Sequence, residues 1–137
     1  MRTLLLHFFD TSNKKHDAIL RNLVKGAESN GNEVTVFDAQ HDNVESLHLA
    51  IYEYIAVAAT SPKFIGAKIP KKLVEILSSA SSINGKKGCV VVIKFGLSSG
   101  KMVHIIMKEL ESHGMVLDYF DVIENIDHSV AVGKKIG

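Results

Sequence analysis

Residues 54–71 read YIAVAATSPKFIGAKIPK, an apolar run followed by a polar loop and then by Pro70 at the start of a helical segment. A continuously apolar run is typical of a central strand in a parallel sheet, which is buried on both faces. The loop after this run carries an aromatic residue, Phe64. Because open α/β sheets bind flat ligands at the carboxyl ends of their strands, we expect a binding site at this loop.

Short β-rich runs alternate with segments of helical periodicity along the rest of the chain. This alternation predicts an α/β three-layer sandwich, in which helices cover both faces of a five-stranded parallel sheet. The first, third and fourth strands are continuously apolar and should be central, whereas the second and fifth alternate and should lie at the edges. The expected strands are 3–9, 33–38, 54–59, 89–95 and 115–120, with a short helix at 45–50 and a closing helix within 125–137.

Composition narrows the class of protein. The chain has 137 residues, of which 46% are hydrophobic, which predicts a single domain spanning residues 1–137. Its apolar runs are far shorter than the roughly 20 residues that cross a bilayer, and no signal cleavage site follows the first strand, so we expect a cytoplasmic protein with no membrane partner. The lone Cys89 lies in a valine run, which predicts a buried, inert thiol.

Other functional classes lack their residues. The seven histidines do not fall at metal-ligand spacings, so no metal site is expected; His7, in the first strand, should be a core residue. Aromatic residues do not alternate with the lysines and the net charge is +1, so we expect no nucleic-acid partner. The glycine-rich dinucleotide fingerprint and the nucleotide-triphosphate loop are both absent.

Three loops carry the candidate site. With strand order 2-1-3-4-5, the loops after the first, third and fourth strands converge on one crevice. The first of these loops, residues 10–15, opens a helix whose free N–H groups favour a phosphate, although on this loop alone an ordinary N-cap with solvated lysines is the preferred interpretation. The last, residues 95–100, has two glycines that allow a ligand to approach the backbone closely.

Taken together, these loops resemble those of the flavodoxin-like family, and the resemblance covers nearly the whole chain. Residues 11–13 (TSN) are similar to the Thr-Gly-Asn core of the family's phosphate loop, residues 60–66 (TSPKFIG) to its Gly-Ser-Pro-Thr-Tyr-Phe-Gly loop, and residues 95–100 (FGLSSG) to its glycine-rich loop. The resemblance implies bound flavin mononucleotide (FMN). It implies contacts from Thr11, Ser12, Asn13 and Lys14 to the phosphate, from Thr60, Ser61, Pro62, Phe64 and Gly66 to the ring, and from Gly96, Leu97, Ser98, Ser99 and Gly100 to the ring's polar edge.

The first loop departs from the family pattern. The usual Ser/Thr-x-Thr-Gly-Asn-Thr becomes FDTSNK at residues 9–14, which loses a hydroxyl at each end. An alternative alignment puts Asp10 at the first hydroxyl, where its carboxylate would repel phosphate. Two lost neutral donors should lower FMN affinity by about one to two decades, and Lys14 would return part of that loss.

Charge is the second departure, because flavodoxins that shuttle electrons are strongly acidic, whereas this chain has 16 Lys+Arg and 15 Asp+Glu. Residues 60–101 contain eight lysines and one glutamate, which gives this stretch of the chain a net charge of +7. They form either a solvated surface or a basic approach surface for the phosphates of NAD(P)H or for an acidic redox protein. These lysines are Lys63, Lys68, Lys71, Lys72, Lys86, Lys87, Lys94 and Lys101.

Three hypotheses for function follow. The first is an FMN-binding electron-transfer protein that serves redox partner proteins and has no catalytic residue of its own. The second is an enzyme, an NAD(P)H-dependent quinone or FMN reductase. The third, motivated by the altered first loop, is a flavodoxin-fold module that no longer binds flavin.

Overall fold

The computed structural model describes residues 1–61, 66–79 and 83–137. The order of the strands in its sheet is β2-β1-β3-β4-β5, and all neighbouring strands run parallel, which confirms the flavodoxin-like topology expected from the sequence. β2 and β5 are the edges, as their alternating patterns predicted. The strands are β1 (Arg2–His7), β2 (Glu33–Asp38), β3 (Tyr54–Thr60), β4 (Lys87–Ile93) and β5 (Val116–Ile123).

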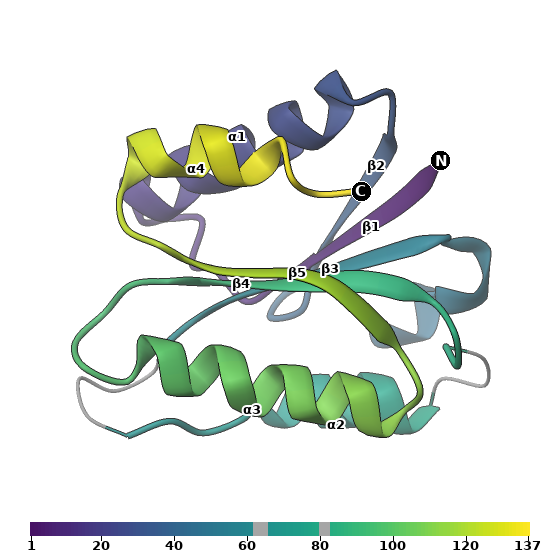
Figure 1. Cartoon of the computed structure of the whole chain (residues 1–137). Coiled ribbons are helices and arrows are strands. Elements are labelled where there is room, and N and C mark those ends of the chain that lie inside the picture. The colour runs from purple at the N-terminus through teal and green to yellow at the C-terminus, as the bar shows by residue number, and fades with distance from the viewer. Residues whose placement is uncertain (62–65, 80–82) are drawn as a thin grey trace.

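Helices cover both faces of the sheet (Figure 1). α1 (Lys14–Ser29) and α4 (Ile126–Gly133) lie on one face, and α2 (Lys71–Ser79) and α3 (Ser99–Ser112) lie on the other. Successive strand residues point to opposite faces, so the sheet feeds two hydrophobic cores. Leu4 and Leu6 belong to the core that also contains residues of α2 and α3, whereas Leu5 belongs to the core that also contains residues of α1 and α4.

Two of the three central strands end earlier than the sequence suggested, whereas β3 runs one residue past its expected end, to Thr60. β1 stops at His7 and β4 at Ile93, each two residues short of the expected end. The apolar residue that misled the prediction is Phe9, which is 0% exposed and packs into the α1–α4 core from the loop, beyond the strand. The buried His7 fixes this bend, because its Nδ1 accepts a hydrogen bond from the Phe9 N–H at 3.1 Å, as expected of a core histidine.

The helix expected at 45–50 is wrong. The segment instead forms two single 3-10 turns, Val44–Ser46 and Leu49–Ile51, and the side chain of Asn43 caps the first. β5 extends three residues past its expected end, to Ile123, where it pairs with Ile93. α2 ends at Ser79, and the remainder of the serine-rich stretch, residues 80–82, lies outside the described residues.

Two glycines allow α1 and α4 to pack closely. A Cβ added to Gly26 would lie 2.6 Å from the Cα of Gly133, and one added to Gly133 would lie 2.5 Å from the carbonyl oxygen of Asn22. Gly133 lowers the helix propensity of α4, but its backbone fits against α1 where no side chain would. In the part of the chain that the structure describes, no helix combines the length and apolarity needed to span a membrane.

Candidate functional site

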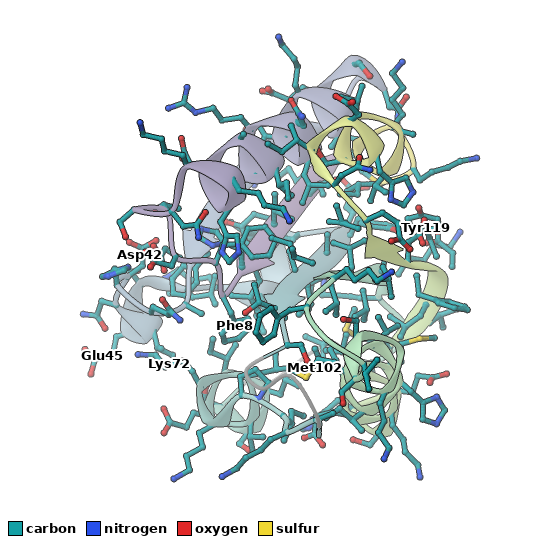
Figure 2. All side chains as sticks on the ribbon, turned by 90° about the vertical axis from the view of Figure 1, so that its left-hand side faces the viewer. Phe8, Asp42, Glu45, Lys72, Met102 and Tyr119 are labelled. Carbon is teal, nitrogen blue, oxygen red and sulfur yellow. The ribbon has the colours of Figure 1, made fainter. Side chains whose placement is uncertain are left out.

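The loops after β1, β3 and β4 meet at the carboxyl edge of the sheet, which faces the viewer in Figure 2. A cavity of about 500 Å³ lies among them, and we call it the edge cavity. Its volume is within the range of roughly 300–1,000 Å³ that small-molecule sites occupy. Among the described residues it is lined by Asn13, Lys15 and His16 from the β1 side, by Thr60 and Ser61 at the end of β3, and by Ile93, Lys94 and Phe95 at the end of β4.

The structure brings part of the predicted site to this cavity. Asn13, Thr60 and Ser61 line it directly. Thr11, Ser12 and Lys14 belong to the same turn as Asn13 but are not among its lining residues, and Pro62 and Phe64 lie outside the described residues.

A hydrogen bond joins the two loops that the resemblance places around the flavin ring. The N–H of Gly66 donates to the hydroxyl of Ser98 at 2.6 Å, and Ser98 is only 6% exposed. Gly66 has φ of 97° and Gly96 has φ of 66°, values that favour glycine at both positions. Leu97, between Gly96 and Ser98 in the chain, is 77% exposed, which leaves its side chain at the protein surface.

Two predicted loop residues belong to a helix instead. Ser99 and Gly100 form the first turn of α3. The hydroxyl of Ser99 accepts a hydrogen bond from the Phe95 N–H at 2.9 Å, so this side chain holds the turn after β4. Gly100 lines a different hollow, together with Phe120 of β5, and is therefore not part of the edge cavity.

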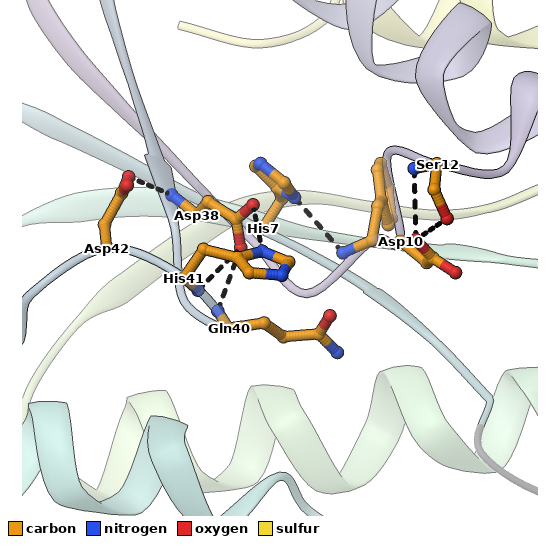
Figure 3. Close-up of polar contacts among 8 residues, drawn as sticks. His7, Asp10, Ser12, Asp38, Gln40, His41 and Asp42 are labelled. Carbon is orange, nitrogen blue, oxygen red and sulfur yellow. Dashed lines mark hydrogen bonds and ion pairs between the residues drawn. The ribbon is translucent and has the colours of Figure 1, made fainter.

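Both donors of Ser12, in the first loop, are already engaged within the loop (Figure 3). The carboxylate of Asp10 accepts hydrogen bonds from the Ser12 N–H at 3.0 Å and from the Ser12 hydroxyl at 2.6 Å. These bonds, the hydroxyl first, hold the pKa of Asp10 below its ordinary value. Every described residue with positive φ is a glycine, so Ser12 needs no left-handed backbone in this turn.

The N-terminus of α1 is capped by its own chain. The side-chain oxygen of Asn13 accepts from the N–H groups of Lys15 at 2.9 Å and His16 at 3.2 Å. These amides are among the few that a helix start leaves free for an anion. The N-cap interpretation of this loop is therefore confirmed, and two of the donors proposed for phosphate are already bonded.

His16 is a lining residue that the sequence analysis missed. Its Nδ1 is buried and makes no hydrogen bond to any described residue, and its ring lies 5.9 Å from that of Phe9. Burial, followed by the charge of Lys15, lowers the pKa of His16, so its ring is neutral at pH 7 and offers one donor and one acceptor. The signal was present in the sequence, because Asn13 and His16 are three residues apart at a helix start and share a face.

The seven described lysines between residues 60 and 101 do not form one surface, and Lys63 lies outside the described residues. Lys86 donates from Nζ to the carbonyl oxygens of Ala50 at 3.1 Å and Tyr52 at 2.6 Å, which ties the start of β4 to the segment before β3. Lys86 therefore lies at the amino ends of the strands. Lys94 lies at the carboxyl ends, where it lines the edge cavity and its ammonium is 3.1 Å from the Glu124 carboxylate. Both partners of this ion pair are about half exposed, so solvent screening leaves it little strength.

A second, smaller cavity of about 280 Å³ lies beside the first, and Thr60 lines both. Phe8 and Met102, labelled in Figure 2, supply apolar lining together with Ile69 and Pro70. Lys68 and Lys71 also line this cavity. Of the described lysines between residues 60 and 101, Lys68, Lys71 and Lys94 thus line these two cavities at the carboxyl ends of the strands.

Histidines and carboxylates also meet at the ends of β1 and β2 (Figure 3). The ring of His41 lies 2.9 Å from a carboxylate oxygen of Asp38, which raises the pKa of His41, and the Asp38 N–H donates to Asp42 at 2.8 Å. Burial lowers the pKa of His7 against the opposing charges of Asp38 and Asp42. No cluster of three or more ligand-type side chains among residues 1–61, 66–79 and 83–137 could hold a metal ion.

The residues present fit a flavin better at its ring than at its phosphate. Lys94 and His16 both line the edge cavity, so a planar ligand there would lie beside the Lys94 ammonium and the His16 ring. The first loop instead presents the carboxylate of Asp10, which already accepts the hydrogen bonds that a bound oxyanion would accept. Asp10 is fully exposed, so its side chain can rotate away from Ser12, but its charge remains in the turn.

The solved structures to which this chain is similar include several flavodoxins. The chain is similar to a flavodoxin from the domain Archaea, with a TM-score of 0.74 and 18% identity over 99% of this chain and 96% of that one. Oxidised Flavodoxin 1 from Bacillus cereus gives a TM-score of 0.71 and 15% identity over 97% and 95% of the two chains, and two-electron reduced flavodoxin from Megasphaera elsdenii gives 0.71 and 15% over 96% and 98%. No family model matches the sequence, and no curated protein matches it. These likenesses extend over nearly the whole chain and show its fold.

Proposed function

We propose that this chain, which has the flavodoxin-like fold, binds FMN at the carboxyl edge of its sheet and carries electrons between redox partner proteins. The observation that carries the proposal is the edge cavity of about 500 Å³, lined from the loops after β1, β3 and β4. Bound FMN would supply the redox chemistry, because flavins exchange one or two electrons. The chain would supply binding, orientation and charge.

Three groups of residues would hold the cofactor. The turn at residues 11–14 would meet its tail, residues 60–66 one side of its ring, and residues 96–98 the ring's polar edge. The hydrogen bond from Gly66 to Ser98 supports this arrangement, because it holds the two ring loops at a fixed separation. His16 would add a neutral donor or acceptor from the first turn of α1.

Charge at the cavity would tune the cofactor. Lys15 and Lys94 line the edge cavity, and a positive charge there favours a ligand that gains electrons. We therefore expect a reduction potential less negative than that of an acidic flavodoxin. Because Glu124 lies 3.1 Å from the Lys94 ammonium, the effect of Lys94 should be smaller than that of an unpaired lysine.

The rim of the cavity offers a surface for a partner. Phe95 is 51% exposed and Leu97 is 77% exposed, and both belong to the loop after β4. Apolar side chains exposed next to a binding site favour transient protein contacts. A partner that docks here would approach the cofactor closely, and the neighbouring lysines would favour an acidic one.

Each alternative has its own support. Lys68 and Lys71 at the second cavity favour an NAD(P)H-dependent quinone or FMN reductase, because two ammonium groups beside an apolar hollow suit a nucleotide phosphate. The contact between Asp10 and Ser12 favours a module that binds no flavin, since it engages donors that FMN would need. We also propose a cytoplasmic location, in keeping with a single cysteine that forms no disulfide.

One purified preparation separates these functions. A yellow protein, or a colourless one that quenches the fluorescence of added FMN on titration, supports the proposal. Steady oxidation of NAD(P)H in the presence of a quinone would assign the reductase instead. A colourless protein that leaves flavin fluorescence unchanged at all concentrations would refute flavin binding. The control is the same titration with urea-unfolded protein, which has no edge cavity.

A further inference from the structure

The first loop places a carboxylate where a phosphate would need donors. The Asp10 carboxylate accepts from both the N–H and the hydroxyl of Ser12, and Asn13 accepts from the first free amides of α1. Four hydrogen bonds that this turn could offer an anion are thus made within residues 10–16. An oxyanion could take them only by displacing the chain's own oxygens.

The charge of Asp10 also opposes a phosphate. The Ser12 hydrogen bonds keep the pKa of Asp10 low, so the carboxylate is ionised at neutral pH. A phosphate monoester carries nearly two negative charges there. Lys14 and Lys15 provide attraction from the same turn, but these two residues and Asp10 are all exposed, so salt screens the attraction and the repulsion alike. The Asp10 repulsion acts at the turn itself.

A hydroxyl-bearing tail fits the same loop without this conflict. A carboxylate is an acceptor of hydrogen bonds, and a sugar alcohol supplies donors. The ribityl chain of a flavin has several hydroxyl groups, and without its phosphate it ends in one more. Asp10 can accept from such a group while keeping its charge solvated, because its side chain is fully exposed.

We infer that the edge cavity does not select for the phosphate and takes flavins with an uncharged polyol tail, such as riboflavin, about as well as FMN. This inference rests on the proposed function, because it assumes that a flavin is the ligand. It differs from that function in the class of ligand: the recognised parts are the ring and the hydroxyls of the tail.

The test is a pair of fluorescence-quenching titrations of the purified full chain, one with riboflavin and one with FMN, under the same buffer and salt. Dissociation constants within tenfold of each other support the inference. An FMN preference of more than tenfold would overturn it while leaving the proposed function intact. If neither flavin binds, the proposed function fails and the inference fails with it.

Asp10→Asn isolates the cause, because the amide keeps an acceptor for Ser12 and removes the charge. Removing repulsion across solvent should tighten FMN binding by about 3- to 10-fold and leave riboflavin binding unchanged. Asp17→Asn is the matched control: Asp17 is on the same helix start but is already paired with Arg21 at 3.0 Å, so both flavins should bind that variant as they bind the wild type. An Asp10→Asn variant that binds FMN no more tightly than the control would overturn the inference.

Discussion

The hydrogen bond between Gly66 and Ser98 offers a quantitative test of how the site is held together. Ser98→Ala removes the hydroxyl that accepts the Gly66 N–H at 2.6 Å, at a position that is only 6% exposed. A partly buried amide left without its partner costs about 1–2 kcal/mol of folding free energy. Divided by a typical urea dependence for a domain of this size, this loss lowers the unfolding midpoint by about 0.5–1 M urea.

The assay is urea unfolding followed by circular dichroism, with Ser112→Ala as the matched control. The Ser112 hydroxyl donates to the carbonyl oxygen of Glu109 at the exposed end of α3, so its loss should move the midpoint far less. Ser98→Thr keeps the hydroxyl and should recover most of the stability. A midpoint for Ser98→Ala equal to that of Ser112→Ala would show that the two loops are not held by this bond, and the argument from loop spacing would fall.

Three further predictions concern the scaffold. Gly26→Ala should destabilise the protein by about 1–3 kcal/mol in thermal unfolding, because the new Cβ would meet the backbone of α4. As the control, a Cβ at Gly100 in α3 meets nothing within 4 Å, so Gly100→Ala should be neutral or stabilising. Equal melting temperatures of the two variants would contradict the close packing of α1 against α4. Cys89 is 0% exposed and burial raises its pKa to about 12, so a thiol reagent at pH 8 should label it only after unfolding, and rapid labelling of the folded chain would be the opposite result. Burial lowers the pKa of His7 in the folded state, so the stability that neutral His7 contributes is present above its unfolded pKa of about 6.5 and is lost as the pH falls below that value. His7→Gln should therefore flatten the decline of the urea midpoint between pH 7.5 and 5.5. An unchanged slope would exclude His7 as the source of that decline.

The sequence predicted the sheet well because the central strands are buried on both faces. The run that ends at Thr60 can be solvated on neither side, so its composition alone makes it central. Strand ends were less predictable, since Phe9 is as apolar as a strand residue and yet fills the core from a loop. Periodicity registers burial, and it cannot tell whether a buried residue is still paired with a neighbouring strand.

The convergence of the three loops could be predicted from the sequence, but the hydrogen bonds within each loop could not. Convergence of the three loops follows from strand order, which is why Asn13 and Thr60 were expected to meet and both line the edge cavity. The orientation of Asp10 toward Ser12 depends on the local turn, which the residue types do not determine. Counting charge along the chain grouped Lys86 with Lys94, although these two lysines flank opposite ends of β4.

The most direct test of the account is to map where a flavin binds. Backbone amide spectra of isotope-labelled protein, recorded by NMR during a riboflavin titration, report each residue separately. The account predicts chemical-shift changes concentrated at the edge cavity, at Asn13, His16, Thr60 and Lys94. The amide of Lys86, at the amino ends of the strands, should not shift. Shifts centred on the amino ends of the strands, or no shifts with either riboflavin or FMN, would contradict the claim that the three loops form a flavin site.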